Sequence, residues 1–147
     1  MKTLRVYLDT SVLGGCFDPE FAAWSNGLIA DLRSGTFRSV LSDLLAAEVR
    51  GAPAPIAELY AELRRLGADE EIATTPEATD LLTAYEAHAV LGPRFRADML
   101  HIALATVAEA DVLVSWNFRH IVRLNKIRLF NAVNAEQGYR PLAIHSP

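Results

Sequence analysis

The sequence predicts an α/β fold in which helices flank a central parallel sheet of four to five strands. Three observations support this class. Strand-like and helix-like segments alternate along the chain, as they do in proteins with parallel sheets. The run Leu4–Leu8 is β-branched and aromatic, and it stops at the turn-prone Asp9-Thr10-Ser11. A second apolar run, Val112–Val114, has the continuous character of a buried strand.

The composition indicates one folded domain spanning residues 1–147. A chain of this length can bury a substantial core, and its 51% hydrophobic content excludes intrinsic disorder. Its apolar stretches are far shorter than the roughly 20 residues that cross a bilayer, and the first residues lack the apolar region of a signal peptide. Cys16 is the only cysteine, so no intramolecular disulfide is expected, and we expect a cytoplasmic protein with no membrane contact.

The charge balance narrows the classes of partner. A net charge of −4 disfavours a broad basic surface that binds nucleic acid without selectivity. It leaves room for a local basic patch, or for a substrate that metal ions bridge to acidic side chains.

In the first half of the chain, helix-like and strand-like segments alternate at short intervals. Apolar residues recur at helical spacing over residues 21–32, and Gly35 ends that helix. Residues 37–41 form the second expected strand. Ser42 follows as the N-cap of a helix over residues 43–50, because its hydroxyl can accept a hydrogen bond from the first turn.

The middle of the chain continues this alternation. A Gly- and Pro-rich segment at residues 51–55 separates the preceding helix from another over residues 56–66. Gly67 is the expected C-cap of that helix. Residues 71–74 are expected to add a short third strand.

The second half is mainly helical. A helix over residues 76–91 begins at a proline, which suits a first helical position. The segment 97–109 is apolar on nearly every side, so we expect a deeply buried helix. Beyond the strand at 112–114, residues 121–137 are mostly helical and residues 142–144 add a last strand.

Asp9 directly follows the first strand, at the edge of the sheet where ligands bind. A carboxylate is well placed there as a ligand, yet Asp-Thr-Ser is also good helix-capping chemistry. This residue alone leaves both interpretations open, and other carboxylates at the same edge would decide between them.

Glu48 breaks the pattern of its helix. Leu41, Leu44 and Leu45 trace a stripe whose next position is Glu48, which puts a carboxylate on the core-facing side. An ionised carboxylate is costly to bury unless it is paired or bound to metal. The alternative is a slightly rotated helix, in which Glu48 reaches solvent or pairs with Arg50 or a more distant arginine.

Asp98 lies in the first turn of the buried helix. A negative charge there is stabilised by roughly 0.3–1 kcal/mol, so capping explains Asp98 as well as ligand binding does. His101 lies one turn further along the same face, where it can orient a carboxylate or a water. More commonly, a histidine on an apolar helix is a core residue whose ring nitrogens are hydrogen-bonded and which has no direct catalytic role.

Asn117 follows the strand at 112–114, in a position equivalent to that of Asp9. Its amide can position a water or a phosphate, or cap the segment that follows. Asp111 precedes the same strand, so we expect it at the opposite edge of the sheet as a turn residue.

Other chemistries lack their motifs in this sequence. Gly14-Gly15 is too short for a phosphate-binding loop, no His/Cys cluster suits zinc, and no G-x-S-x-G elbow is present. Hard oxygen ligands without sulfur or histidine select Mg²⁺ or Mn²⁺.

Four blocks carry these candidates in a characteristic order and spacing: Tyr7-Leu8-Asp9-Thr10-Ser11-Val12, Glu48 in a short second helix, Asp98-x-x-His101-Ile102-Ala103-Leu104-Ala105, and Leu113-Val114-Ser115-Trp116-Asn117-Phe118-Arg119-His120. Together they resemble a PIN domain, and most closely the VapC-type toxins of bacterial toxin–antitoxin pairs. The resemblance covers essentially the whole chain.

The resemblance implies a Rossmann-like PIN fold, endoribonuclease activity on an RNA substrate, a homodimer, and a small cognate antitoxin protein that blocks the site. By position, it implies that Asp9, Glu48 and Asp98 bind Mg²⁺ (or Mn²⁺), with Asn117 as a fourth catalytic residue. Many family members have an acid in place of Asn117, so three carboxylates remain, which are enough for one metal ion.

Basic residues near the acids are the candidates for contacts with the RNA backbone. They form two clusters, one after the last strand of the acidic site and one before Asp98: Arg119, His120, Arg123, Lys126 and Arg128, then Arg94 and Arg96. Ser11 and His101 complete the candidate substrate contacts. A solvated charged face explains either basic cluster equally well.

Two other functions fit parts of the sequence. A catalytically weak or inactive PIN-like module that binds RNA or protein is favoured by Asn117 and by the acidic net charge. A phosphoacceptor domain with Asp9 as nucleophile is disfavoured, because Ser11 stands where the haloacid-dehalogenase pattern has a second acid.

Overall fold

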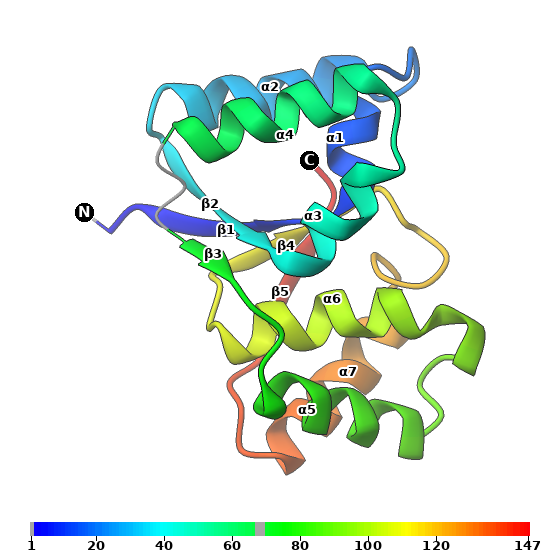
Figure 1. The fold of residues 1–147 in the computed structure, drawn as a ribbon. Coiled ribbons are helices and arrows are strands. Elements are labelled where there is room, and N and C mark those ends of the chain that lie inside the picture. The colour runs from blue at the N-terminus through cyan, green and yellow to red at the C-terminus, as the bar shows by residue number, and fades with distance from the viewer. Residues whose placement is uncertain (1, 67–69) are drawn as a thin grey trace.

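A parallel sheet forms the centre of the computed structural model, which describes residues 2–66 and 70–147. Its five strands run in the order β3-β2-β1-β4-β5, and every neighbouring pair is parallel (Figure 1). The strands are β1 (Leu4–Leu8), β2 (Phe37–Ser42), β3 (Glu70–Ile72), β4 (Val112–Val114) and β5 (Ala143–His145). The expected α/β class with four to five parallel strands is confirmed.

Helices cover both faces of this sheet. They are α1 (Thr10–Gly15), α2 (Ala22–Arg33), α3 (Asp43–Arg50), α4 (Ala54–Arg65), α5 (Pro76–Ala87), α6 (Arg96–Val107) and α7 (Leu124–Glu136), with a 3₁₀ turn at Pro93–Phe95. Figure 1 shows α2 and α4 above the sheet and α5, α6 and α7 below it. In the part of the chain described, no helix is long and apolar enough to span a membrane.

Each face of the sheet has its own hydrophobic core, because successive side chains of a strand point to opposite faces. In β1, Tyr7 packs with α5, α6 and α7, whereas Val6 and Leu8 pack with α1, α2 and α4. Helix α6 lies directly on the sheet and buries Met99 and every residue from 101 to 106, as its all-round apolar pattern predicted.

Local signals located several elements correctly. β1 has the predicted bounds, and Ser42 caps α3 through a 3.1 Å hydrogen bond that its Oγ accepts from the backbone N–H of Leu45. Gly35 adopts a positive φ of 79°, which suits the residue that ends α2. The predicted C-cap at Gly67 lies outside the described residues.

Two local predictions were wrong. The segment after Asp9 continues directly into α1 and is more than a turn. Helix α5 ends at Ala87, well before Leu91, because Ala89 takes a left-handed φ of 51° that cannot continue a helix. The helix expected over residues 21–32 is confirmed as α2, which buries Ser25, Ile29 and Leu32 and leaves Trp24 64% exposed.

Candidate active site

The carboxyl ends of the strands bring the predicted acids to one edge of the sheet. Asp9 directly follows β1, Glu48 lies on α3 after β2, and Asp98 lies in the first turn of α6. Asn117 follows the end of β4, which pairs with β1. Electrostatic interactions link the group: the charge of Glu48 acts on Asp98, and His101 acts on both Asp9 and Asp98.

Asp9 is buried and held by two serine hydroxyls. Its side chain is 4% exposed, and its Oδ1 and Oδ2 accept hydrogen bonds of 2.6 Å from Ser11 and Ser115, respectively. It is the N-cap residue of α1, as one interpretation of the sequence predicted, but its side chain makes no capping hydrogen bond. Burial raises the pKa of Asp9 above its usual value, although both serine hydrogen bonds oppose the rise.

The same serines join the end of β1 to the end of β4. The Oγ of Ser11 accepts a 2.9 Å hydrogen bond from the backbone N–H of Trp116, and the Oγ of Ser115 accepts one from Asn117 N–H at 2.9 Å. Ser115 is fully buried and was not among the site residues predicted from the sequence. Its place at the end of β4, two residues after the buried Leu113, was the available signal.

Glu48 is half-buried and has two donors on one oxygen. Its Oε1 accepts hydrogen bonds from Thr10 Oγ1 at 2.8 Å and from His101 Nε2 at 2.5 Å. The partner is therefore a histidine, and the alternative pairing with an arginine is wrong. Burial works to raise the pKa of Glu48, but its interactions with His101 and Thr10 outweigh burial and hold that pKa below its usual value.

His101 lies inside the core and not on a surface that RNA can reach. Its side chain is 3% exposed, and both ring nitrogens are engaged, Nε2 by Glu48 and Nδ1 by the hydroxyl of Tyr7 at 2.6 Å. In this arrangement His101 orients a carboxylate, which was one of the two roles the sequence allowed.

Asp98 is half-buried at the start of α6. Burial raises its pKa, and the negative charge of Glu48 adds to the rise, whereas His120, His101 and a hydrogen bond from the Asn117 side chain oppose it. An acid whose charge is disfavoured in this way gains from a nearby cation.

Asn117 holds the loop that follows β4. Its Oδ1 accepts hydrogen bonds from the backbone N–H groups of Arg119 at 3.2 Å and His120 at 3.0 Å. The carbonyl oxygen of its side chain therefore caps this turn, as one interpretation of the sequence predicted, and the amide group is directed to Asp98.

The donor set suits a hard divalent cation in kind, although the side chains are not gathered around one point. Asp9, Glu48 and Asp98 offer only oxygen atoms, which Mg²⁺ and Mn²⁺ prefer. Within the described residues, no group of three or more His, Cys, Asp or Glu side chains is placed to hold an ion. Binding one here requires the three carboxylates to move closer together.

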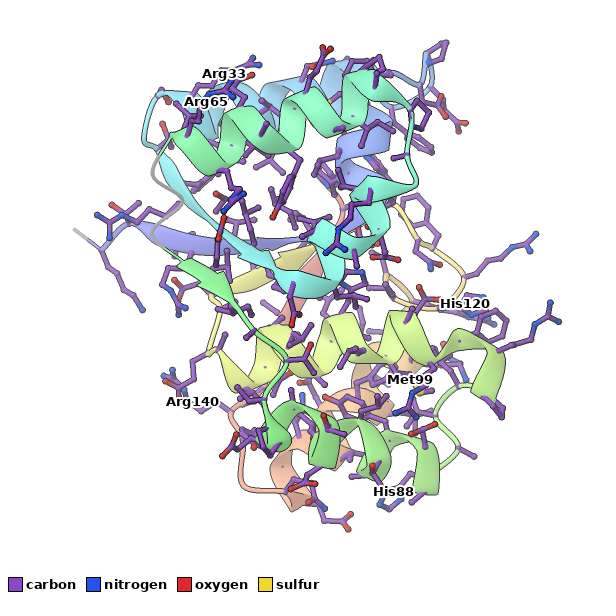
Figure 2. The ribbon with its side chains drawn as sticks, in the orientation of Figure 1. Arg33, Arg65, His88, Met99, His120 and Arg140 are labelled. Carbon is purple, nitrogen blue, oxygen red and sulfur yellow. The ribbon has the colours of Figure 1, made fainter. Side chains whose placement is uncertain are left out.

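Several candidate basic residues already have partners. Arg96 pairs with Glu86 at 2.6 Å, and Lys126 Nζ donates to the carbonyl of Val90 at 2.8 Å. The His120 ring packs on Phe95 with 3.8 Å between centroids, beside the amino end of α6 in Figure 2. Arg94 lies over the same ring, whereas Arg119, Arg123 and Arg128 are exposed at the surface.

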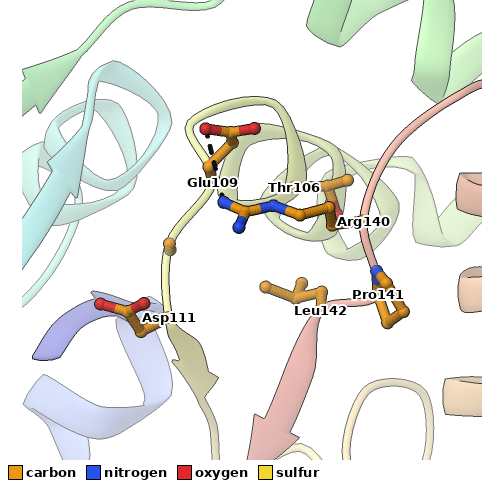
Figure 3. Close-up of a pocket in the computed structure, with 7 residues that line it drawn as sticks. Thr106, Glu109, Asp111, Arg140, Pro141 and Leu142 are labelled. Carbon is orange, nitrogen blue, oxygen red and sulfur yellow. Dashed lines mark ion pairs between the residues drawn. The ribbon is translucent and has the colours of Figure 1, made fainter.

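A separate hollow lies at the opposite edge of the sheet (Figure 3). It has a volume of about 220 Å³, and its residues include Thr106, Asp111 and the ion pair of Glu109 with Arg140 at 3.5 Å. Asp111 accepts a 2.8 Å hydrogen bond from the backbone N–H of Arg5, close to the start of β1. As expected for a turn residue before β4, Asp111 is remote from Asp9, Glu48 and Asp98.

Solved structures share this fold over nearly the whole chain. A chain of VapBC2 from Rickettsia felis, bound to a promoter DNA fragment, is 14% identical with a TM-score of 0.59, and the match covers 98% of this chain and 99% of that one. A chain of FitAB bound to an IR36 DNA fragment is 15% identical with a TM-score of 0.60, covering 97% and 94%. FitAcB from Neisseria gonorrhoeae is 16% identical with a TM-score of 0.56, covering 95% and 96%.

These identities are low, so the likeness concerns the fold. It confirms the Rossmann-like PIN fold that the sequence predicted. No family model matches the sequence, and no curated protein does.

Proposed function

We propose that this chain is a metal-dependent endoribonuclease of the VapC toxin type, which hydrolyses RNA phosphodiester bonds. The observation that carries the proposal is the convergence of Asp9, Glu48 and Asp98, from three separate elements, at the carboxyl edge of the sheet. The fold shared with chains of VapBC2 and FitAB supports the same family.

Each residue at this edge has a distinct part in the proposed reaction. Asp9, Glu48 and Asp98 would hold Mg²⁺ (or Mn²⁺), which when bound would activate a water for in-line attack and neutralise the scissile phosphate. Ser11 and Ser115 orient the Asp9 carboxylate, and the Asn117 amide donates to Asp98. The exposed Arg119 and its basic neighbours are available for the RNA backbone.

We extend the proposal to two protein partners. VapBC2 and FitAB are two-component assemblies by name, which supports a cognate antitoxin for this chain. The resemblance of the sequence to VapC-type toxins supports a homodimer. Exposed apolar side chains on α7, Leu124 and Leu129, offer surface suited to a protein contact.

The test of the nuclease is cleavage of RNA by the purified full chain with Mg²⁺, with and without chelator. We expect Asp9→Asn to lower the rate by about 100-fold or more, because several kcal/mol of metal-derived stabilisation would be lost. Asp111→Asn, at the opposite edge, is the control and should cleave like the wild type. Equal cleavage by Asp9→Asn and the wild type would refute the proposal.

A binding module without catalysis is the second candidate. It is favoured by the side-chain positions, because the three carboxylates are not gathered around one point and the Asn117 oxygen is occupied by its own turn. Tight binding of RNA with no turnover in Mn²⁺ would support this candidate over the nuclease.

A further inference from the structure

A buried chain of hydrogen bonds ends on Glu48. It runs from Ser42 Oγ to the Tyr7 hydroxyl at 2.8 Å, from that hydroxyl to His101 Nδ1 at 2.6 Å, and from His101 Nε2 to Glu48 Oε1 at 2.5 Å. Ser42, Tyr7 and His101 are all almost fully buried and come from the end of β2, from β1 and from α6. The chain thus joins three elements that meet beneath the candidate site.

The chemistry of the two end residues fixes the direction in which each hydrogen bond of this series is donated. A carboxylate that binds a cation is ionised and only accepts hydrogen bonds, so in the proposed site His101 Nε2 donates to Glu48 Oε1. With Nε2 as the donor, Nδ1 of a neutral imidazole accepts a hydrogen bond from the Tyr7 hydroxyl. Ser42 donates to the Tyr7 oxygen and itself accepts from Leu45 N–H, so the buried side chains of Ser42, Tyr7 and His101 all have hydrogen-bond partners.

The two oxygens of Glu48 differ in their environment. Both donors, Thr10 and His101, act on Oε1, and Oε2 receives no hydrogen bond from the residues that the structure describes. Hydrogen bonds to one oxygen of a carboxylate restrict rotation of the group and leave its second oxygen available to bind a ligand. A histidine buried only to fill the core does not require a hydrogen bond to a partly exposed acid such as Glu48, near Asp98.

We infer that His101 is a positioning residue which, anchored by Tyr7 and Ser42, holds Glu48 by Oε1 and leaves Oε2 as a ligand for the divalent cation. The inference rests on the proposed metal site and assigns His101 a role other than RNA contact. Ligand carboxylates elsewhere are oriented by such hydrogen-bonded partners, whose loss typically costs about 10–100-fold in metal affinity.

The test is binding of Mn²⁺ to the metal-free full chain, followed by the electron paramagnetic resonance signal of free Mn²⁺, with no RNA present. We expect His101→Leu to weaken binding about 10–100-fold. His101→Gln should stay within about threefold of the wild type, because the amide Nε2 can still donate to Glu48. Tyr7→Phe, which removes only the anchoring hydroxyl, should fall between them.

Tyr85→Phe is the matched control for lost stability. Tyr85 is a second fully buried tyrosine of the same core, and its hydroxyl donates to Asn134, which is not among the candidate ligands. Both tyrosine variants should lower the unfolding midpoint, but only Tyr7→Phe should weaken Mn²⁺ binding. Equal Mn²⁺ affinity in the two would overturn the inference, and this comparison holds even if His101→Leu does not fold.

Glu48→Gln separates failure of this inference from failure of the proposed function. If that variant loses Mn²⁺ while the His101 variants bind like the wild type, the positioning role is wrong and the metal site stands. If Glu48→Gln binds Mn²⁺ like the wild type, Glu48 is not a ligand, and both proposals about it are wrong. Equal weakening by His101→Gln and His101→Leu would mean that the imidazole only fills space.

Discussion

Hydroxyl groups set the positions of the acidic side chains at the candidate site. Ser11 and Ser115 donate to Asp9, Thr10 donates to Glu48, and Tyr7 reaches Glu48 through His101. A neutral hydroxyl donor offsets part of the cost of burying a carboxylate and leaves its negative charge in place. An arginine partner would instead neutralise that charge. The negative charge therefore remains available to a cation.

Asp111 provides a prediction for a single residue far from this site. The backbone hydrogen bond from Arg5, with Lys2 nearby, holds its pKa below the usual value. Such a group adds stability above its unfolded pKa of about 3.9 and loses it as the pH falls through the folded value. Asn keeps an acceptor for Arg5 but does not titrate, so Asp111→Asn should lose less stability than the wild type between about pH 5 and 2.

Urea unfolding at a series of pH values measures this difference. Asp80→Asn, a change at an exposed residue of α5, serves as the control and should follow the wild-type curve. If the acid slopes of Asp111→Asn and the wild type coincide, the contact with Arg5 does not perturb the carboxyl group.

At the scale of elements, α1 depends on one close approach. A Cβ on Gly15 would lie 2.6 Å from both Ser25 Oγ and Trp116 Nε1, so only glycine lets α1 pack here without displacing them. A Cβ on Gly14 in the same helix would make only ordinary van der Waals contact, with Ile56 Cδ1 at 3.8 Å. Trp116 immediately precedes Asn117, so this packing also supports the loop at the site.

The two adjacent glycines should respond to alanine in opposite ways. Gly15→Ala should destabilise the fold by about 1–3 kcal/mol through overpacking. Gly14→Ala should stabilise it by up to about 1 kcal/mol, because alanine is the better helix former. Urea denaturation compares the two, and a Gly15→Ala variant as stable as Gly14→Ala would show that Trp116 and Ser25 move aside freely.

At the scale of the whole molecule, one sheet separates two hydrophobic cores (Figure 1). The strands contribute alternate side chains to both, so loss of either core exposes one face of the same sheet. We therefore expect residues 1–147 to unfold as one cooperative unit, as a single domain does.

Matched leucines test this cooperativity. Leu81 of α5 and Leu63 of α4 are each 1% exposed, one in each core, and alanine at either should cost about 2–5 kcal/mol. Tryptophan fluorescence and far-ultraviolet circular dichroism should report the same midpoint for each variant. Trp24 and Trp116 lie on the side of α2, so an unchanged fluorescence midpoint in Leu81→Ala would mean that the layers unfold separately.

Elements defined by nearby residues were predictable from sequence. The apolar run of β1 and the Ser42 cap of α3 depend on neighbours within a few positions, so their pattern survives in the linear chain. Helix α1 was missed because two glycines weaken its local signal, and its packing depends on Trp116, about a hundred positions away. The early end of α5 arises from the backbone conformation of Ala89, which no residue preference indicates.

The sequence by itself determined the parallel α/β order and identified Asp9, Glu48 and Asp98 as candidate site acids, because periodicity and strand ends are properties of local chemistry. Only the tertiary structure decided how those acids are held. Ser115 contacts Asp9 across 106 positions, and His101 contacts Tyr7 across 94 and Glu48 across 53. Hydrogen bonds between such distant segments exist only once the sheet has formed, because the fold alone brings their donors and acceptors within reach.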